Sequence, residues 1–274
     1  MPVKRVNARN AATIASAGLW VGAAAPVAAL PPLGGEMNHV NITLSGGAFG
    51  VFIDSADPMI LQGPGSGLSG AEGVLNGMHF NGQYGWLPAG FWGPPPGGAV
   101  WVEQREPVPG LVCYAGRSQL GTTVFEPLHF TEGADPGFMW DGAMTHNYFA
   151  ARRHGTYVAP FRVYMGDSSG TMLSGFEPVE MDLVFRLEID PCDRADYSTT
   201  GSNPGDAAFG FADGVIDVTD LTYFVEAWVS GDLADADVTT AETNPGDEGW
   251  GERDGAITIS DLTWYIERWI SGCG

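Results

Sequence analysis

Lysine is nearly absent from this 274-residue chain: Lys4 is the only one, and 12 basic residues stand against 33 acidic ones. The resulting net charge of −21 repels nucleic acid and anionic lipid surfaces, while it favours solubility and the uptake of cations. The chain also lacks a run of the roughly 20 apolar residues that a membrane-spanning helix requires. The composition therefore predicts no nucleic-acid partner and no membrane span in the mature protein.

The most basic stretch lies at the N-terminus. Lys4, Arg5 and Arg9 precede a weakly apolar, alanine-rich run and then small residues that end at Ala29. This order is typical of a secretory signal peptide. We expect residues 1–29 to be cleaved off after Ala29, which removes three of the 12 basic residues and places the protein outside the cell or at its surface.

Cysteine is scarce as well, with three in the chain. Cys192 and Cys273 lie at the two ends of the acidic C-terminal region, which predicts a disulfide between them in an oxidising compartment. The alternative for Cys273 is covalent attachment to a surface. Cys113 follows an apolar run without close basic neighbours, which indicates a small buried core residue and not a reactive thiol.

Residues 30–189 form the first predicted domain. Short runs of β-branched and aromatic residues alternate with Gly- and Pro-rich turns, and no segment has a capped helical stripe. We expect strands at 39–44, 49–54, 99–106, 110–116, 156–167 and 179–189. About 160 residues of this kind are typical of one all-β sandwich or jelly-roll-like domain.

The function of this domain is open at the level of sequence. Tyr84, Trp86, Phe91 and Trp92 lie in a segment, 81–98, whose glycines and prolines disfavour regular structure. These aromatic residues either plug the end of the core or form an exposed loop that stacks on sugar rings. No catalytic motif is present, and the five histidines have no metal-type spacing. Glu103, Glu106 and Asp141 are the acids weighed for a glycosidase pair.

The C-terminal region, residues 190–274, contains an internal duplication. Residues 195–231 match residues 236–272 when the chain is shifted by 41 positions. The matched pairs include Asp196 with Asp237, Asp206 with Asp247, Asp213 with Asp254, Asp220 with Asp261, and Trp228 with Trp269. This self-similarity indicates two copies of one structural unit.

Each repeat carries the second half of an EF-hand calcium loop, in which a carboxylate, a turn glycine, a carbonyl and a closing carboxylate supply oxygen ligands. In the first repeat these ligands are Asp213, the carbonyl of Val215, Asp217 and Asp220. In the second they are Asp254, the carbonyl of Ala256, Thr258 and Asp261. The first half of each loop contains an insertion. Asp196 and Asp237 are the predicted first ligands, with Asp206 and Asp247 as further ligands, which gives two Ca²⁺ sites.

A single helix is expected after each loop, with an apolar stripe that buries one face. The stripe residues are Leu221, Phe224, Val225 and Trp228, and Leu262, Tyr265, Ile266 and Trp269. Pro204 and Pro245 exclude a helix before each loop.

A loop followed by one helix, in tandem, resembles the dockerin module of secreted proteins. The match is closer to the C-terminal, GC-type dockerin-like tails of planctomycete-type secreted proteins, which end in Gly-Cys, the dipeptide that Gly272 and Cys273 form here. The resemblance implies calcium binding, pseudo-twofold symmetry, and docking to a cohesin-like or other surface or assembly protein. It also implies that Val218, Thr219, Ile259 and Ser260 contribute to the choice of partner.

Two functions follow. The first is a secreted, calcium-dependent binding or structural protein that docks through its tail, with polysaccharide as one ligand considered for the β-domain. The alternative is a dockerin-borne enzyme that acts on polysaccharides.

Overall fold

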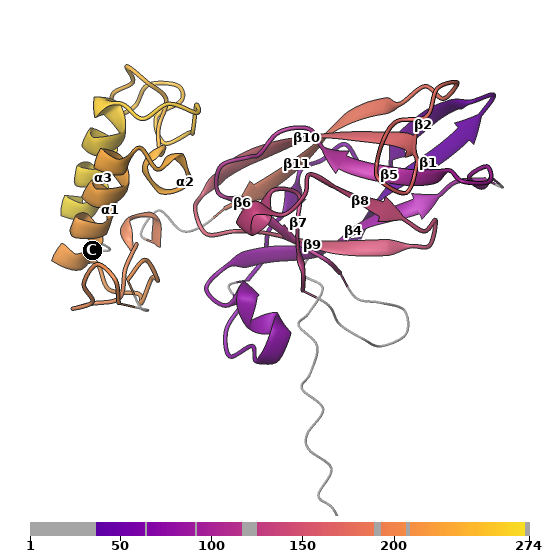
Figure 1. Ribbon diagram of the computed structural model, residues 1–274. Coiled ribbons are helices and arrows are strands. Elements are labelled where there is room, and N and C mark those ends of the chain that lie inside the picture. Colours follow the sequence, from indigo (N-terminus) through magenta and orange to yellow (C-terminus); the bar gives the residue numbers. More distant parts are fainter. Residues whose placement is uncertain are drawn as a thin grey trace, which may run out of the picture.

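The computed structural model describes residues 37–63, 65–90, 92–116, 125–188, 193–206 and 209–271. A β-rich domain is followed by a smaller tail whose regular elements are mostly helices (Figure 1). The expected cleavage site at Ala29, Phe91, and both Cys192 and Cys273 lie outside the described residues. In the part of the chain that the structure covers, no helix combines the length and the apolar character needed to cross a bilayer.

Two sheets build the β-domain. One has the strand order β2-β1-β4-β9-β6-β7 and the other β3-β11-β10-β5-β8, and most neighbouring strands are antiparallel. The strands are β1 Asn38–Ser45, β2 Ala48–Ile53, β3 Met59–Ile60, β4 His79–Pro88, β5 Ala99–Gln104, β6 Leu111–Tyr114, β7 Pro127–Leu128, β8 Gly137–Trp140, β9 Thr145–Ala151, β10 Gly155–Gly166 and β11 Val179–Leu187. Short 3₁₀ helices, η1 Gly70–Leu75 and η2 Thr131–Gly133, lie between strands.

One hydrophobic core is shared by the two sheets. Val40 of β1 and Phe149 of β9 belong to the same buried cluster as Val102 of β5, Phe161 of β10 and Phe185 of β11. Alternation along the strands directs these side chains inward: in β10, Tyr157 and Ala159 are buried, whereas Val158 between them is 48 % exposed. The sheets are therefore held together by the inward-facing half of each strand.

The six strands predicted from sequence are confirmed as β1, β2, β5, β6, β10 and β11. The expectation of irregular structure for residues 81–88 is wrong, because these residues belong to β4, which pairs with both β1 and β9. Gly82 explains part of the error: a Cβ atom there would lie 2.6 Å from the ring of Tyr148, so glycine admits a cross-strand aromatic side chain.

Tyr84, Trp86 and Trp92, the described aromatic residues among the four singled out in this segment, pack in or against the core. Tyr84 and Trp86 are buried, and the indole of Trp92 packs against the same cluster and donates to the carbonyl of Ile42. Cys113 is also buried, as predicted, and burial raises the pKa of its thiol well above the usual value. A neutral thiol of this kind is a packing residue.

His129 makes the β-domain sensitive to acid. Its ring lies among Phe138, Phe149 and Phe161, and its Nδ1 is 2.8 Å from the carbonyl oxygen of Pro136. Burial lowers the pKa of His129 to about 4, although the hydrogen bond to Pro136 opposes this. Between pH 6.5 and pH 4, His129 is therefore protonated in the unfolded chain and neutral in the folded chain. The free energy of unfolding falls as the pH drops through this range.

We expect this loss to reach about 3 kcal/mol, from the difference between the two pKa values. His129→Asn should remove most of it, because asparagine tolerates the positive φ of 51° at this position and does not titrate. Urea unfolding from pH 8 to pH 4 measures the effect. If the free energy of unfolding of the variant depends on pH as steeply as that of the wild-type protein, another group causes the acid sensitivity.

The tail has three helices in its described part: α1 Val218–Ser230, α2 Leu233–Ala236 and α3 Ile259–Ser271, preceded by the 3₁₀ turn η3 Asp193–Ala195. The predicted helices of the two repeats are confirmed as α1 and α3, whereas the short α2 was not predicted. Their matched residues Phe224 and Tyr265 stack face to face, with ring centroids 3.9 Å apart. This stack lies in the core of the tail.

The two repeats also exchange equivalent hydrogen bonds. The indole of Trp228 donates to the carbonyl of Thr258, at 2.8 Å, and the indole of its counterpart Trp269 donates to the carbonyl of Asp217, at 2.6 Å. Asp217 and Thr258 are themselves matched positions of the two loops. Each helix therefore fixes the loop of the other repeat in a reciprocal arrangement.

One detail of the predicted apolar stripes is wrong. Leu221, Phe224 and Trp228 face the core of the tail, but Val225 is 38 % exposed and its counterpart Ile266 is 36 % exposed. Both side chains lie on the outer side of their helices because packing of α1 against α3 covers a narrower face than the sequence pattern suggests.

Candidate functional site

In the first repeat, the structure brings distant carboxylates together around one loop. Asp196 accepts hydrogen bonds from the backbone N–H groups of Asp213, at 3.1 Å, and Gly214, at 2.5 Å, although 17 and 18 residues separate them. Asp220 accepts from the N–H groups of Tyr197 and Ser198, both at 2.7 Å. Asp196 and Asp220 are 5 % and 0 % exposed. The insertion therefore folds so that buried carboxylates from both ends of the loop bond to its backbone.

The other predicted ligands of this repeat border the same loop. Asp213 is exposed and accepts from the N–H of Thr200, a bond that lowers the pKa of its carboxyl group. Asp217 begins α1 as its N-cap and accepts from the N–H of Thr219. Asp220 in turn accepts from the N–H of Asp217, which completes a capping box. Two of the predicted ligands therefore also hold the start of the helix.

The second repeat reproduces this arrangement. Asp237 accepts from the N–H groups of Asp254 and Gly255, and Asp261 accepts from those of Val238 and Thr239. Asp237 and Asp261 are 3 % and 0 % exposed. Asp254 accepts from the N–H of Ala256, whose carbonyl is a predicted ligand, and Thr258 donates its hydroxyl to Asp261. The same bonds at the same repeat positions show that the loop geometry is duplicated.

Asp206 and Asp247 lie apart from these acids in their bonding. Each is exposed and accepts from the backbone N–H three residues earlier, that of Asn203 or Asn244, at 2.8 Å in both cases. These bonds stabilise tight turns within the two insertions. The structure therefore gives Asp206 and Asp247 a local turn role and does not join them to the carboxylates around Asp196 and Asp237.

The buried carboxylates are electrostatically unfavourable as they stand. Burial raises the pKa of Asp196, and the charges of Asp220 and Asp213 add to the rise. Burial also raises the pKa values of Asp220 and Asp237. Among the ion pairs of the described residues, none involves Asp196 or Asp220. Buried carboxylates without a counter-charge are normally neutralised by a cation or by protons.

The donor set suits a hard cation. The matched acids, the carbonyls of Val215 and Ala256 and the hydroxyl of Thr258 are all oxygen ligands, as Ca²⁺ prefers. An ionised carboxylate has about four lone-pair sites, so oxygens that accept an N–H bond retain capacity for a metal. Within the described residues, no three His, Cys, Asp or Glu side chains already lie at metal-binding separations. The acids would therefore have to close further around a metal ion.

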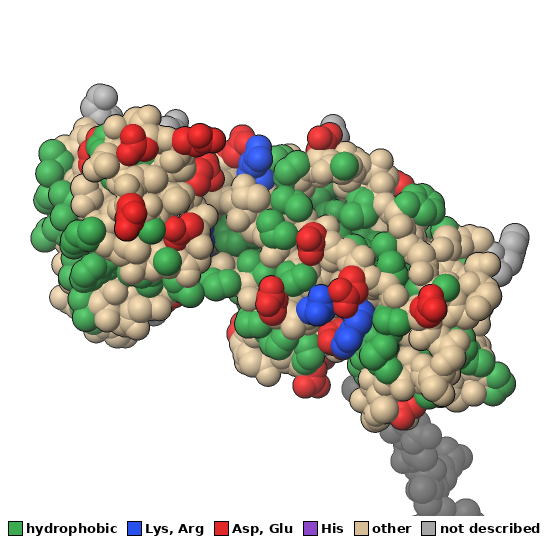
Figure 2. All heavy atoms as spheres, turned by 90° about the horizontal axis from the view of Figure 1, so that it is seen from above, with side chains coloured by type: hydrophobic (Ala, Val, Ile, Leu, Met, Phe, Trp, Pro, Cys, Tyr) green, Lys and Arg blue, Asp and Glu red, His purple; other side chains and the backbone are tan. Residues whose placement is uncertain are grey.

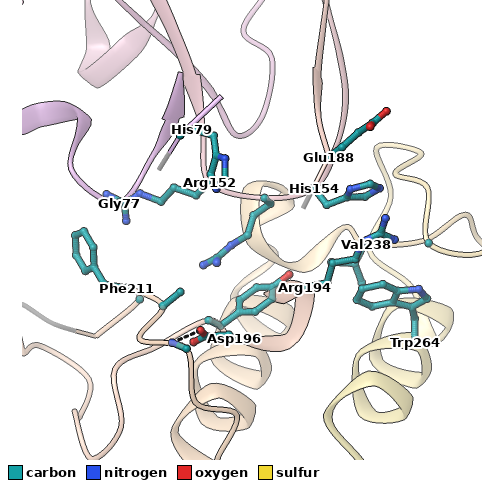
Figure 3. A pocket seen from close by; sticks show the side chains of 17 residues that line it. Gly77, His79, Arg152, His154, Glu188, Arg194, Asp196, Phe211, Val238 and Trp264 are labelled. Carbon is teal, nitrogen blue, oxygen red and sulfur yellow. Dashed lines mark hydrogen bonds between the residues drawn. The ribbon is translucent and has the colours of Figure 1, made fainter. Parts of the chain in front are cut away.

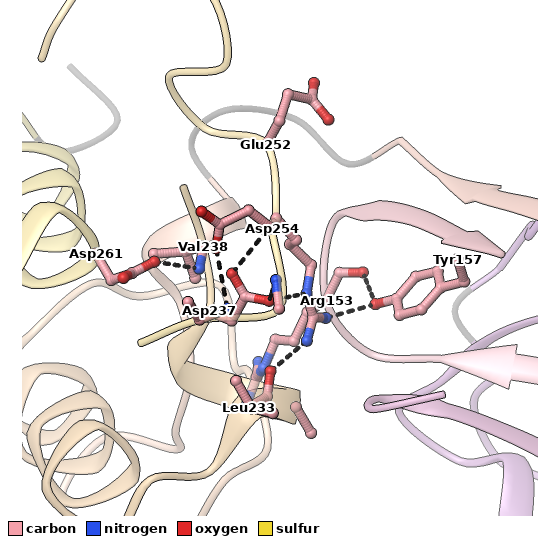
Figure 4. A network of polar contacts seen from close by, with 12 residues as sticks. Arg153, Tyr157, Leu233, Asp237, Val238, Glu252, Asp254 and Asp261 are labelled. Carbon is pink, nitrogen blue, oxygen red and sulfur yellow. Dashed lines mark hydrogen bonds and ion pairs between the residues drawn. The ribbon is translucent and has the colours of Figure 1, made fainter. Parts of the chain in front are cut away.

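Arg253 breaks the symmetry of the two loops. Its Nε lies 3.7 Å from Oδ2 of Asp237, and its guanidinium donates to the carbonyl of Leu233 and to the hydroxyl of Tyr157 in β10. Figure 4 shows Asp237, Leu233 and Tyr157, the three residues that these contacts join. The matched residue in the first repeat is Ala212. The second loop therefore has a positive charge beside its first carboxylate, and the first loop has none at the matched position.

A second arginine joins the β-domain to the tail. Arg153, in the turn between β9 and β10, forms an ion pair with Asp235 of α2, with Nε 2.6 Å from Oδ1. Its guanidinium lies over the ring of Tyr197, 3.7 Å from the centroid. Both ion-pair side chains are largely buried, at 9 % and 15 % exposure. Tyr197, the neighbour of Asp196 in the chain, thus lies at the contact between the two domains.

The outer faces of α1 and α3 carry matched apolar side chains. The exposed residues are Val218, Val225 and Val229, and their counterparts Ile259, Ile266 and Ile270. Hydrophobic side chains are visible along the side of the tail farthest from the β-domain (Figure 2). Of the four residues expected to choose a partner, Val218 and Ile259 are exposed, whereas Thr219 and Ser260 are 6 % exposed and face inward. Sequence spacing alone did not separate these two groups.

Two of the acids weighed for catalysis, Glu103 and Asp141, do not form a pair. Glu103 accepts from Arg162 at 2.7 Å, and Asp141 accepts from the N–H of Ala143 in a turn. Because Glu103 pairs with Gly137 and Val100 pairs with Trp140, Glu103 and Asp141 lie toward opposite ends of β5.

No protein-family model matches the chain, and no curated protein matches it.

Proposed function

We propose that the tail is a calcium-binding docking module of the dockerin-like kind and that it attaches a secreted β-domain to a surface or assembly protein. The observation that carries this proposal is the duplicated set of buried carboxylates, Asp196 with Asp220 and Asp237 with Asp261, held by equivalent backbone N–H groups. Two calcium ions, one in each loop, would neutralise these charges. Export by the N-terminal segment is part of the proposal.

Docking is supported by the apolar side chains on α1 and α3. Val218, Val225 and Val229 follow one face of α1, and the matched isoleucines follow one face of α3. Exposed apolar residues that recur on a duplicated surface favour a protein partner. A cohesin-like or other surface protein with an apolar contact face is the proposed partner, and Val218 and Ile259 are the proposed contacts.

For the β-domain we propose a sandwich of the jelly-roll kind in a binding or structural role, with polysaccharide as a candidate ligand. An enzyme is the less favoured alternative, since Glu103 and Asp141 are separated and engaged elsewhere. A polysaccharide pull-down with a reducing-sugar assay separates the two: retention without sugar release supports binding, and release supports an enzyme.

Calcium titration tests the central proposal. We expect the chelator-treated protein to bind two Ca²⁺ ions per chain and to gain helical circular dichroism, because mutual repulsion of the acids opposes folding of the metal-free tail. The loop of the second repeat should bind Ca²⁺ more weakly than that of the first, since Arg253 already places a positive charge beside Asp237. Isothermal titration calorimetry gives the stoichiometry and both affinities. A tail that is fully helical in chelator and takes up no calcium would refute the proposal.

A further inference from the structure

Three arginines and two histidines of this acidic chain line one cavity. Arg152, Arg153 and His154 reach it from the turn between β9 and β10, Arg194 from η3, and His79 from the start of β4 (Figure 3). The cavity has a volume of about 520 Å³ and lies between the β-domain and the tail, with lining residues from both repeats. This volume is within the range of small-molecule sites. Three of the chain's arginines are thus concentrated where a ligand of modest size fits.

Acidic residues also border the cavity, but the contacts of one are directed away from the arginines. Asp196 accepts from the N–H groups of Asp213 and Gly214, and Glu188 lies beside His154 on the β-domain side of the cavity (Figure 3). Burial, together with the charges of Arg194 and Arg186, lowers the pKa of His154 to about 4. His154 is therefore neutral at pH 7, and the positive charge beside the cavity comes from the arginines.

Aromatic rings hold two of the guanidinium groups in place. Arg152 lies over Phe211, with its Cζ 4.3 Å from the ring centroid, and Arg153 lies over Tyr197, at 3.7 Å. Stacking uses the flat faces of a guanidinium group and leaves the N–H groups at its edges free to donate. The edges are thus fixed in orientation before any ligand binds, which lowers the entropic cost of binding.

Two buried donors in the cavity wall lack an acceptor within the described part of the chain. They are Nη2 of Arg153 and Nε1 of Trp264, whose residues are 8 % and 2 % exposed. Buried N–H groups without a partner are rare and cost about 1 to 3 kcal/mol each. The Nε of the same Arg153 is already bonded to Asp235, and Nη2 is a donor of this side chain that remains for a ligand.

We propose that this cavity binds an oxyanion, namely the carboxylate or sulfate group of a small ligand such as an acidic sugar. Arg152 and Nη2 of Arg153 would donate to the oxyanion, with a geometry that guanidinium groups match well. This function goes beyond calcium-dependent docking, because its proposed donors, Arg152 and Arg153, belong to the β-domain and are not ligands of either loop.

Isothermal titration calorimetry of the intact, calcium-loaded protein tests the site with three probes: sodium sulfate, sodium glucuronate and glucose, at constant ionic strength in chloride. We expect saturable binding of glucuronate at one site per chain and none of glucose. Sulfate binding with equal affinity would identify a general oxyanion site, whereas binding of glucuronate alone would identify a carboxylate on a sugar. Absence of saturable binding for both anions would overturn the proposal.

Arg152→Gln should weaken anion binding at least tenfold, because it removes one charged donor and leaves the ion pair of Arg153 with Asp235 in place. Arg105→Gln is the matched control, since Arg105 is exposed and pairs with Glu180. Equal losses in both variants would overturn the proposal. If Arg152→Gln does not fold, phenylglyoxal labelling of the wild-type protein tests the same site. Bound glucuronate should protect Arg152 and leave Arg105 reactive. Equal reactivity of Arg152 with and without glucuronate would refute the site.

Discussion

Asp220→Ala is expected to reduce the calcium stoichiometry from two ions to one and to destabilise the tail. Asp220 is fully buried, closes the first loop and accepts from the N–H groups of Tyr197, Ser198 and Asp217. The substitution removes a proposed metal ligand and leaves three N–H groups without their acceptor. Each such loss costs about 1 to 3 kcal/mol, so the effect on the tail is large even before calcium is added.

Asp261→Ala should produce the corresponding loss in the second loop, because Asp261 makes the equivalent bonds to Val238 and Thr239. Since the second site is expected to be the weaker, this variant should retain the tighter of the two calcium-binding events in the titration. The double variant should fail to gain helical structure with calcium. Glu226→Ala is the control: Glu226 is an exposed acid of α1, and its loss removes the same charge without affecting a loop.

Calorimetry and circular dichroism together separate a metal role from a structural one. A purely structural Asp220 would lower the thermal stability of the tail and leave two calcium ions bound per folded chain. Unchanged stoichiometry in Asp220→Ala would therefore contradict the assignment of this residue as a calcium ligand.

Arg153→Met is expected to uncouple the unfolding of the tail from that of the β-domain. The methionine keeps the apolar stem of the arginine side chain. It leaves the carboxylate of Asp235, whose side chain is 15 % exposed, without its ion-pair partner. Tyr223 donates to the same carboxylate, and the charge of Arg153 helps to lower the pKa of Asp235 against the effect of burial. Breaking a buried ion pair from one side costs about 3 to 5 kcal/mol. Calorimetric unfolding should show separate transitions, with the tail at the lower temperature.

Arg105→Met provides the control for this experiment, since the same substitution in an exposed pair should change stability by no more than about 0.5 kcal/mol. Adding Asp235→Leu to Arg153→Met should recover part of the loss, because no charge is then left buried without a partner. Identical unfolding profiles for the wild-type protein and Arg153→Met would show that the ion pair does not join the two domains energetically.

Sequence reasoning was most successful where the information is local or repeated. The 41-residue offset pointed to α1 and α3 and related Phe224 to Tyr265 before their stacking was known. Alternating apolar residues likewise marked β10 and β11. Helical and strand periodicities are properties of neighbouring residues, so they can be recognised without the rest of the fold.

The tertiary structure alone decided which partners distant residues acquire. β4 is a strand because β1 and β9 supply its hydrogen bonds and Gly82 makes room for Tyr148, which outweighs its unfavourable composition. Val225 and Ile266 face outward because only the packing of α1 on α3 defines the buried side. The contact of Arg153 with Asp235 joins residues 82 positions apart, and no local pattern encodes such a pair.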